Sequence, residues 1–371
     1  DANHVIDETA AVRFNLLQAY ENVPDREPAD RSRVGYAGSL LFKPLDKLRI
    51  IADIYHLEAA DKPDLGTYIK PNGGAPVVDL PVYVQDQDFL TSDVDIATLR
   101  LEYDFTDSVR LTNALRKGSA DNGYVSTGAR GTTRGVNDPA AGVDTATLSS
   151  HNGWQQVDYL SNQTNLFVDT ELAGMKHQFI VGMEYTDHAV LNGVYTNLSN
   201  PANFNCITGN TAVANNAYCI VDASGAYITN INSVMGRSIT KGNWDSDWNV
   251  KTWSLSLMDT VELTDSLNLF AGVRMDDFDY SNTIQNTTTL AKTPYTYGDL
   301  LFNWNAGLVY KVNDFGNVYG SFSSASEING GESDLGANCG YGGICTVAGN
   351  PALVKSSKPE KTANIEIGTK W

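Results

Sequence analysis

The side chains in this sequence that could do chemistry are not spaced for a familiar catalytic centre. The chain has no Gly-x-Ser-x-Gly elbow, no His-Glu-x-x-His pair and no phosphate-binding loop, so an enzyme is the least favoured class of function. The five histidines are scattered, and we expect them to lie on solvated surfaces rather than in one site: His4, His56, His151, His177 and His188.

Clustered carboxylates are the ligands that hard cations prefer, and one acidic stretch offers them. It contains Asp86, Asp88, Asp93 and Asp95, without the spacing of an EF-hand. A solvated acidic loop is the stronger interpretation, and a loop calcium site stays open.

The four cysteines form two local pairs, each within a Gly/Asn-rich stretch. We expect disulfide bridges Cys206–Cys219 and Cys339–Cys345, formed in an oxidising compartment. A zinc site is a weak alternative, because no second ligand pair has the C-x-x-C spacing.

Charge and hydropathy exclude two broad classes of protein. The 44 acidic residues against 26 basic ones give a net charge of -18, which argues against a nucleic-acid partner. No apolar run reaches the roughly 18 residues of a transmembrane helix. Residues 1–20 do not resemble a signal peptide, so we expect a mature chain or one whose start is missing.

Strict alternation of two kinds of side chain is the main secondary-structure signal. In residues 94–105 one face carries Ala97, Leu99, Leu101, Tyr103 and Phe105, and the other carries Thr98, Arg100, Glu102 and Asp104. The pattern predicts about twelve strands, near residues 9–22, 33–43, 48–58, 94–105, 109–121, 158–172, 177–190, 249–263, 267–281, 300–311, 316–325 and 361–371. Many exceed the roughly 9–11 residues that cross a bilayer at a tilt.

Short and long connections alternate between these strands. The short ones are predicted at 44–47, 106–108, 173–176, 264–266 and 312–316, and the long ones at about 23–32, 59–93, 122–157, 191–248, 282–299 and 326–360. This predicts an all-β, antiparallel transmembrane barrel with short periplasmic turns and long extracellular loops. A soluble propeller, sandwich or solenoid is the alternative, but a propeller needs a sequence repeat, and we find none.

Several segments resemble the barrel of TonB-dependent ferric-siderophore receptors, especially the catecholate type. The clearest is residues 357–371, Ser-Lys-Pro-Glu-Lys-Thr-Ala-Asn-Ile-Glu-Ile-Gly-Thr-Lys-Trp, and others are residues 11–15, 55–58 followed by 62–66, 166–170 and 176–185. The resemblance implies that residues 1–371 are part of a barrel of about 22 strands. The N-terminal plug and the C-terminal strands of that barrel would then be absent.

The resemblance also implies a function and partners. The complete protein would import a ferric siderophore across the outer membrane of a Gram-negative bacterium, energised by the TonB–ExbB–ExbD complex through the missing plug. It would be a monomer in lipid and lipopolysaccharide, without a resident cofactor. Importers of cobalamin, a nickel chelate or a glycan remain open, and so does a passive porin. A haem receptor is disfavoured, because residues 323–326 and 350–353 lack the haem signature and its histidine.

A ferric siderophore is a large, flat and often anionic chelate, so its site should combine aromatic faces with a few cations. The extracellular loops offer Tyr68, Tyr83, Arg130, Arg134, Tyr295 and Tyr297 as ligand-binding candidates. The Gly/Ser/Thr-rich residues 126–135 are expected to be flexible enough to aim Arg130 and Arg134 at one ligand. Charged pore-lining residues would instead hydrogen-bond the plug: Arg49, Arg100, Glu102, Arg110, Arg116 and Arg274.

Overall fold

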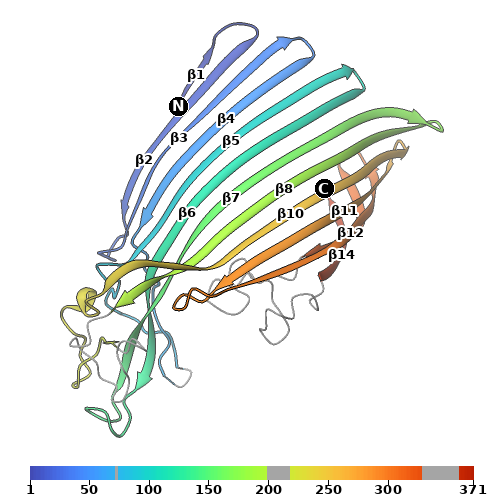
Figure 1. Ribbon diagram of the computed structural model, residues 1–371. Coiled ribbons are helices and arrows are strands. Elements are labelled where there is room, and N and C mark those ends of the chain that lie inside the picture. Colours follow the sequence, from blue (N-terminus) through green and yellow to red (C-terminus); the bar gives the residue numbers. More distant parts are fainter. Residues whose placement is uncertain (72–73, 199–217, 328–358) are drawn as a thin grey trace.

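The strands of the chain form one large, curved antiparallel sheet (Figure 1). The computed structural model describes residues 1–71, 74–198, 218–327 and 359–371. The elements are β1 (Ala2–Val5), β2 (Ala10–Asn22), β3 (Asp30–Leu45), β4 (Leu48–Asp61), β5 (Phe89–Thr106), β6 (Val109–Thr133), β7 (Asp144–Leu172), β8 (Met175–Leu198), β9 (Tyr218–Cys219), the 3-10 helix η1 (Ile231–Ser233), β10 (Ser238–Thr264), β11 (Leu267–Gln285), β12 (Lys292–Asn313), β13 (Gly316–Glu327) and β14 (Glu360–Lys370). No helix in the described ranges is long and apolar enough to cross a membrane.

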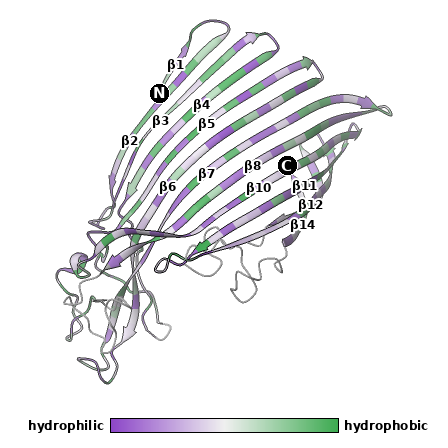
Figure 2. Cartoon of the chain, viewed as in Figure 1, coloured by the Kyte–Doolittle hydropathy of each residue, from purple (hydrophilic) through white to green (hydrophobic). Residues whose placement is uncertain are grey.

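The two-residue β9 pairs only with β7. Leaving β9 aside, each strand pairs with the next one along the chain, so that β8 pairs with β10. The pairing puts like side chains on the same face. Leu101 lies opposite Ile50, while Glu102 lies opposite Arg49 on the other face. Figure 2 shows the alternation of hydrophobic and hydrophilic residues along the strands. The predicted two-faced strands are therefore confirmed.

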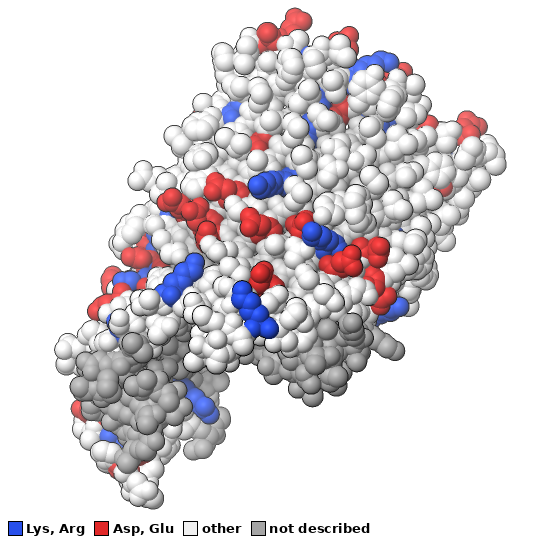
Figure 3. Space-filling model, viewed as in Figure 1, with Lys and Arg blue, Asp and Glu red and all other residues white. Residues whose placement is uncertain are grey.

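The two faces of the sheet differ in polarity: one is apolar and the other polar. Large apolar side chains of one face stay exposed, among them Leu255 and Phe302, although no soluble protein would leave a whole row of them in water. On the convex side seen in Figure 3, much of the area over the strands carries few charges. This face suits lipid, and the polar concave face suits the interior of a barrel.

The alternation of short and long connections is also confirmed. Tight turns occupy 46–47, 107–108, 173–174, 265–266 and 314–315, and a long segment, 62–88, joins β4 to β5. Two predicted long loops were wrong. Strands β6 and β7 stay paired out to Thr133 opposite Asp144, so that only 134–143 is loop, and 286–291 alone joins β11 to β12.

The main apolar core lies at the long-loop end, beyond the part of the sheet whose convex face carries the exposed apolar side chains. Segment 62–88 and residues 218–237 pack there against the extended β6–β7 hairpin, at the lower left of Figure 1. We call this unit the loop assembly. Its buried side chains are Tyr68, Leu80, Tyr83, Ala146, Leu148, Ile220, Val221, Ile231, Val234 and Met235.

Candidate functional site

The clearest candidate site is a row of aromatic side chains on the concave face. It crosses five neighbouring strands, β7, β8, β10, β11 and β12. It lies nearer to the long loops than the band of exposed apolar side chains on the convex face, such as Leu255 and Phe302, which we call the apolar belt. The row consists of Tyr159, His188, Trp248, Tyr280, Phe278 and Tyr297. We call it the aromatic row.

Strand register brings these rings together. Val250 lies opposite Tyr280, which lies opposite Tyr297 on β12. The ring centroids of His188 and Trp248 are 5.1 Å apart, and those of Phe278 and Tyr297 are 5.3 Å apart, distances typical of interacting aromatic pairs. The row therefore is continuous: Phe278 and Tyr280 are buried in it, and its other rings are partly exposed.

Two polar atoms of the aromatic row are left without a partner. Nε1 of Trp248 and the hydroxyl of Tyr297 are buried and have no hydrogen-bond partner within the described parts of the chain. A buried donor without a hydrogen-bond acceptor costs free energy, so an acceptor from a bound molecule would be favourable here. Flat rings that carry unused donors can stack on a planar ligand and also hydrogen-bond its oxygen atoms.

The candidates Tyr295 and Tyr297 both belong to this region. Each is half-buried on β12, and both pack against the small core formed by Phe278, Tyr280 and Leu301. Residues Tyr159, His188, Trp248, Phe278 and Tyr280 were missed in the sequence. The available signal was the spacing of Phe278 and Tyr280, two residues apart and hence on one face.

Tyr68 and Tyr83 lie in the core of the loop assembly instead. Only 1% of Tyr83 is exposed, and burial raises the pKa of its phenol to about 12. Burial likewise raises the pKa of Tyr68. Both rings therefore hold the assembly together in this structure.

The structure does not bring Arg130 and Arg134 to one surface. Residues 126–133 belong to β6, so the expected flexible stretch is strand, and Arg130 is exposed on it. Arg134 is buried and donates hydrogen bonds to the carbonyl oxygens of Pro139 (3.1 Å) and Val221 (2.5 Å). A ligand-binding role for either arginine stays a prediction.

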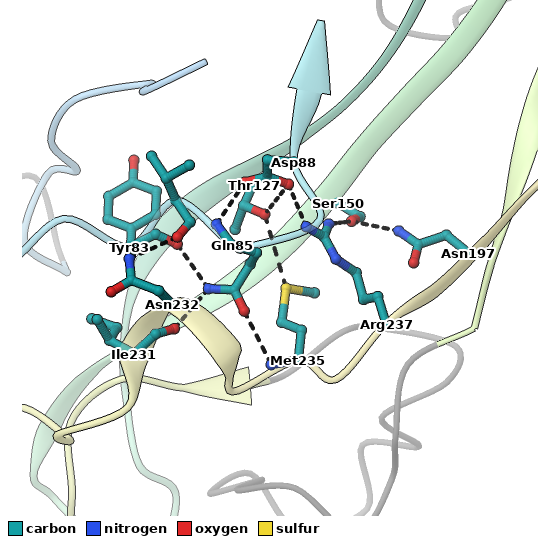
Figure 4. A network of polar contacts seen from close by, with 11 residues as sticks. Tyr83, Gln85, Asp88, Thr127, Ser150, Asn197, Ile231, Asn232, Met235 and Arg237 are labelled. Carbon is teal, nitrogen blue, oxygen red and sulfur yellow. Dashed lines mark hydrogen bonds and ion pairs between the residues drawn. The ribbon is translucent and has the colours of Figure 1, made fainter. Parts of the chain in front are cut away.

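A polar network ties the loop assembly to the barrel (Figure 4). The side chains of Asp88 and Arg237 form an ion pair, both fully buried. Asp88 also accepts hydrogen bonds from the hydroxyl of Thr127 (2.9 Å) and the backbone N–H of Gln85 (2.8 Å). Burial raises the pKa of the Asp88 carboxyl even though Arg237 lies beside it.

Gln85 connects the same network to η1. Its side-chain amide donates to the carbonyl oxygens of Tyr83 (2.8 Å) and Ile231 (2.7 Å) and accepts from the N–H of Met235 (3.1 Å). Segment 62–88 and residues 231–237 are thus held together by buried polar contacts as well as by apolar packing.

The acidic stretch does not form the single cation site that its sequence allowed. Asp88 is used in the buried ion pair, Asp86 is exposed, and Asp93 and Asp95 project from β5 beside His56. The four carboxylates do not converge.

Of the cysteines, Cys219 lies in β9 and is fully buried. Cys206, Cys339 and Cys345 fall outside the described residues. Both predicted bridges therefore stay predictions.

The charged residues of the concave face have partners within the sheet. Arg49 pairs with Glu102 (2.7 Å), and Arg274 bridges Glu184 (2.9 Å) and Asp276 (2.7 Å). The others of this set behave alike: Arg100 pairs with Asp53, Arg110 lies over the ring of Phe167, and Arg116 donates to Thr98. Their expected contacts with a plug stay a prediction.

A curved antiparallel sheet with an apolar convex face, tight turns at one end and long loops at the other defines an outer-membrane β-barrel. The chain belongs to the family described as TonB dependent receptor-like, beta-barrel, whose model matches residues 44–371. Proteins of this family are transport receptors of the Gram-negative outer membrane, and that membrane is the location of this chain.

Two curated relatives match the whole of this chain. The catecholate siderophore receptor Fiu of Escherichia coli (strain K12) is 26% identical over 406 residues, and the probable TonB-dependent siderophore receptor PiuA of Acinetobacter baumannii is 26% identical over 391 residues. The matches cover 50% and 49% of those proteins, so the chain spans about half their length.

Solved structures of the same two receptors have this fold. The closed form of Fiu, described as a ferric-catecholate import receptor, superposes with a TM-score of 0.76 at 23% identity and is covered over 53% of its length. The siderophore receptor PiuA also gives a TM-score of 0.76, at 24% identity and 52% coverage. In both cases 100% of this chain is covered.

Proposed function

We propose that this chain is the barrel part of a receptor that imports a ferric siderophore of the catecholate type. The aromatic row carries the proposal, because a catecholate chelate is built from flat rings and oxygen atoms. The relatives support it, since Fiu is a catecholate siderophore receptor and PiuA a probable siderophore receptor. Energy would come from the TonB–ExbB–ExbD complex through a plug domain outside residues 1–371.

The geometry favours stacking as the mode of recognition. The partly exposed rings of Trp248 and Tyr297 face the concave side, where a ligand that enters between the loops would meet them, and the buried Tyr280 packs among them. The unpartnered Nε1 of Trp248 and hydroxyl of Tyr297 would donate to chelate oxygens.

The sequence candidates divide between two roles in this proposal. Tyr295 and Tyr297 would contact the ligand directly, and the exposed Arg130 would attract its negative charge. Tyr68, Tyr83 and Arg134 would act at one remove, by holding the loop assembly over the entrance. None of the relatives favours a cobalamin, nickel-chelate, glycan or porin function.

The test uses the full-length receptor and the variants Trp248→Ala and Tyr297→Ala, singly and together. Each aromatic contact contributes about 0.5–1.5 kcal/mol, so the double variant should bind a ferric catecholate roughly tenfold or more weakly. Cells that depend on this receptor should then need more chelate to grow when iron is limiting.

A matched control is Trp253→Ala, because Trp253 lies on β10 like Trp248 but on the convex, lipid-suited face. It should leave the affinity unchanged at equal amounts of receptor in the outer membrane. Equal losses in the Trp253 and Trp248 variants, or no loss in the double variant, would contradict the proposal.

A further inference from the structure

A second cluster of ligand-type side chains lies on the opposite face of the sheet. It consists of His56 and Glu58 on β4 and of Asp93 and Asp95 on β5. His56 lies directly opposite Asp95, and Glu58 lies opposite Asp93, so all four side chains leave the same face. We call them the His56 cluster.

Register places this cluster at the edge of the apolar belt. On β4 its face continues the row of Ile50 and Ile54, and on β5 it continues that of Leu99 and Leu101. The cluster is nearer to the long loops than these apolar residues. In Figure 3, acidic and basic side chains form a band between the nearly uncharged area and the loop end.

The negative charge of the cluster is not neutralised by its neighbours. Among the described residues, no Lys or Arg forms a salt bridge with Glu58, Asp93 or Asp95; Asp93 and Asp95 pair with Nδ1 of His56, and Glu58 pairs with its Nε2. Asp121 of β6, opposite Asp93, adds a further carboxylate to the same face. Carboxylates gathered in this way repel one another and favour the binding of a cation.

The spacing of the ligand atoms fits a small divalent metal ion. Nδ1 of His56 is 2.9 Å from Asp95 Oδ1 and 3.7 Å from Asp93 Oδ1, and the ligand atoms of these three residues lie within 4.8 Å of one another. Ligands bound tetrahedrally at about 2.0–2.1 Å from zinc are separated by roughly 3.3 Å. The pair His56–Asp95 is already near this spacing, and the carboxylate of Asp93 would have to move by up to about 1.5 Å to complete the site.

The imidazole of His56 is also held in place. Its ring stacks on that of Tyr36, with centroids 5.0 Å apart, and its side chain is only 19% exposed. A preorganised nitrogen ligand beside two carboxylates suits zinc and related transition metals, whereas calcium and magnesium prefer oxygen alone.

We propose that His56, through Nδ1, and the carboxylates of Asp93 and Asp95 bind a divalent transition-metal ion such as Zn²⁺ on the outer face of the barrel. The ion would clamp β4 to β5 at the base of segment 62–88. Since the aromatic row lies on the other face, this site is separate from the path of an imported chelate, and the proposal does not rest on siderophore transport.

The test is a titration of the full-length receptor in detergent with Zn²⁺ alone, in competition with a chromophoric chelator. Wild-type protein should bind one equivalent that His56→Gln lacks, and Asp95→Asn should weaken this equivalent at least tenfold. Zn²⁺ should raise the unfolding midpoint of the wild type more than that of either variant.

Controls separate this site from other surface histidines and acids. The double variant His151→Gln with Asp158→Asn removes an exposed His and an exposed Asp elsewhere, and it should titrate like the wild type. Identical titrations of wild type and His56→Gln would overturn the proposal. A shift with Ca²⁺ but none with Zn²⁺ would also overturn it, because an imidazole ligand would then play no part.

Discussion

Removal of Arg237 should open the loop assembly and leave the barrel intact. In Arg237→Met the carboxyl of Asp88 stays buried, with only the donors Thr127 and Gln85 left to it. Loss of one partner from a buried ion pair costs about 3–5 kcal/mol. Because the pair joins segment 62–88 to residues 231–237, the cost should fall on local opening of these segments.

Hydrogen exchange on the full-length receptor measures this opening free energy segment by segment. A loss of about 3–5 kcal/mol corresponds to amide exchange that is roughly a hundred- to several-thousand-fold faster. The faster exchange should be confined to the loop assembly, while amides of β10–β12 in the apolar belt should exchange as in wild type.

The control is Arg33→Gln, which breaks a partly exposed pair with Asp61. Pairs of that kind contribute about 0–1 kcal/mol, so exchange there should change less than tenfold. If Arg237→Met changed exchange in the loop assembly no more than Arg33→Gln does, the buried pair would not hold the assembly and the reasoning would be wrong.

The same pair gives a direction for pH dependence. The folded assembly raises the pKa of Asp88, so between the unfolded value of about 3.9 and the raised value the folded form binds the proton more tightly. Stability of the assembly should therefore fall as pH rises through that window and level off above it. In Arg237→Met the window should extend to higher pH, which exchange measured at several pH values would detect.

Further predictions follow from the topology, the cysteines and the arginines. An accessibility tag at 107–108 or 265–266 should stay hidden on intact cells, whereas one in the exposed turn 222–226 should be labelled; labelling at both ends would refute the orientation. Peptide mapping without reduction should find Cys206–Cys219 and Cys339–Cys345, and a bridge between the pairs would contradict this. Arg134→Ala should expose the loop assembly to protease, because two backbone carbonyls lose their donor, while Arg130→Ala should not.

Most of the barrel could be predicted from the sequence, because its strands lie between two different solvents. In residues 94–105, Leu99 and Leu101 lie on the face that suits lipid, and Arg100 and Glu102 lie on the polar face of the barrel interior. The alternation is therefore visible within this one segment. Beyond the belt both faces meet water or loops. Ser126 and Thr127 of β6 are then buried polar residues of a strand, and nothing in their sequence distinguishes them from a loop.

The candidate site was harder to predict from the sequence, for a different reason. Its rings come from five strands, and only the register sets Trp248 beside His188 and Tyr280. Residue type was no guide either, since Tyr83 and Arg134 have side chains suited to a chelate but serve the core of the loop assembly.

Strand register also explains how one sheet can hold two unrelated sites. Neighbouring residues of a strand point to opposite faces, so β10 presents Trp248 to the concave side and Trp253 to the convex side. The His56 cluster and the aromatic row both begin where the apolar belt ends, because only there does the outer face meet water and the inner face meet an incoming ligand. Substitutions at one site should therefore leave the other unchanged, with measured effects that add.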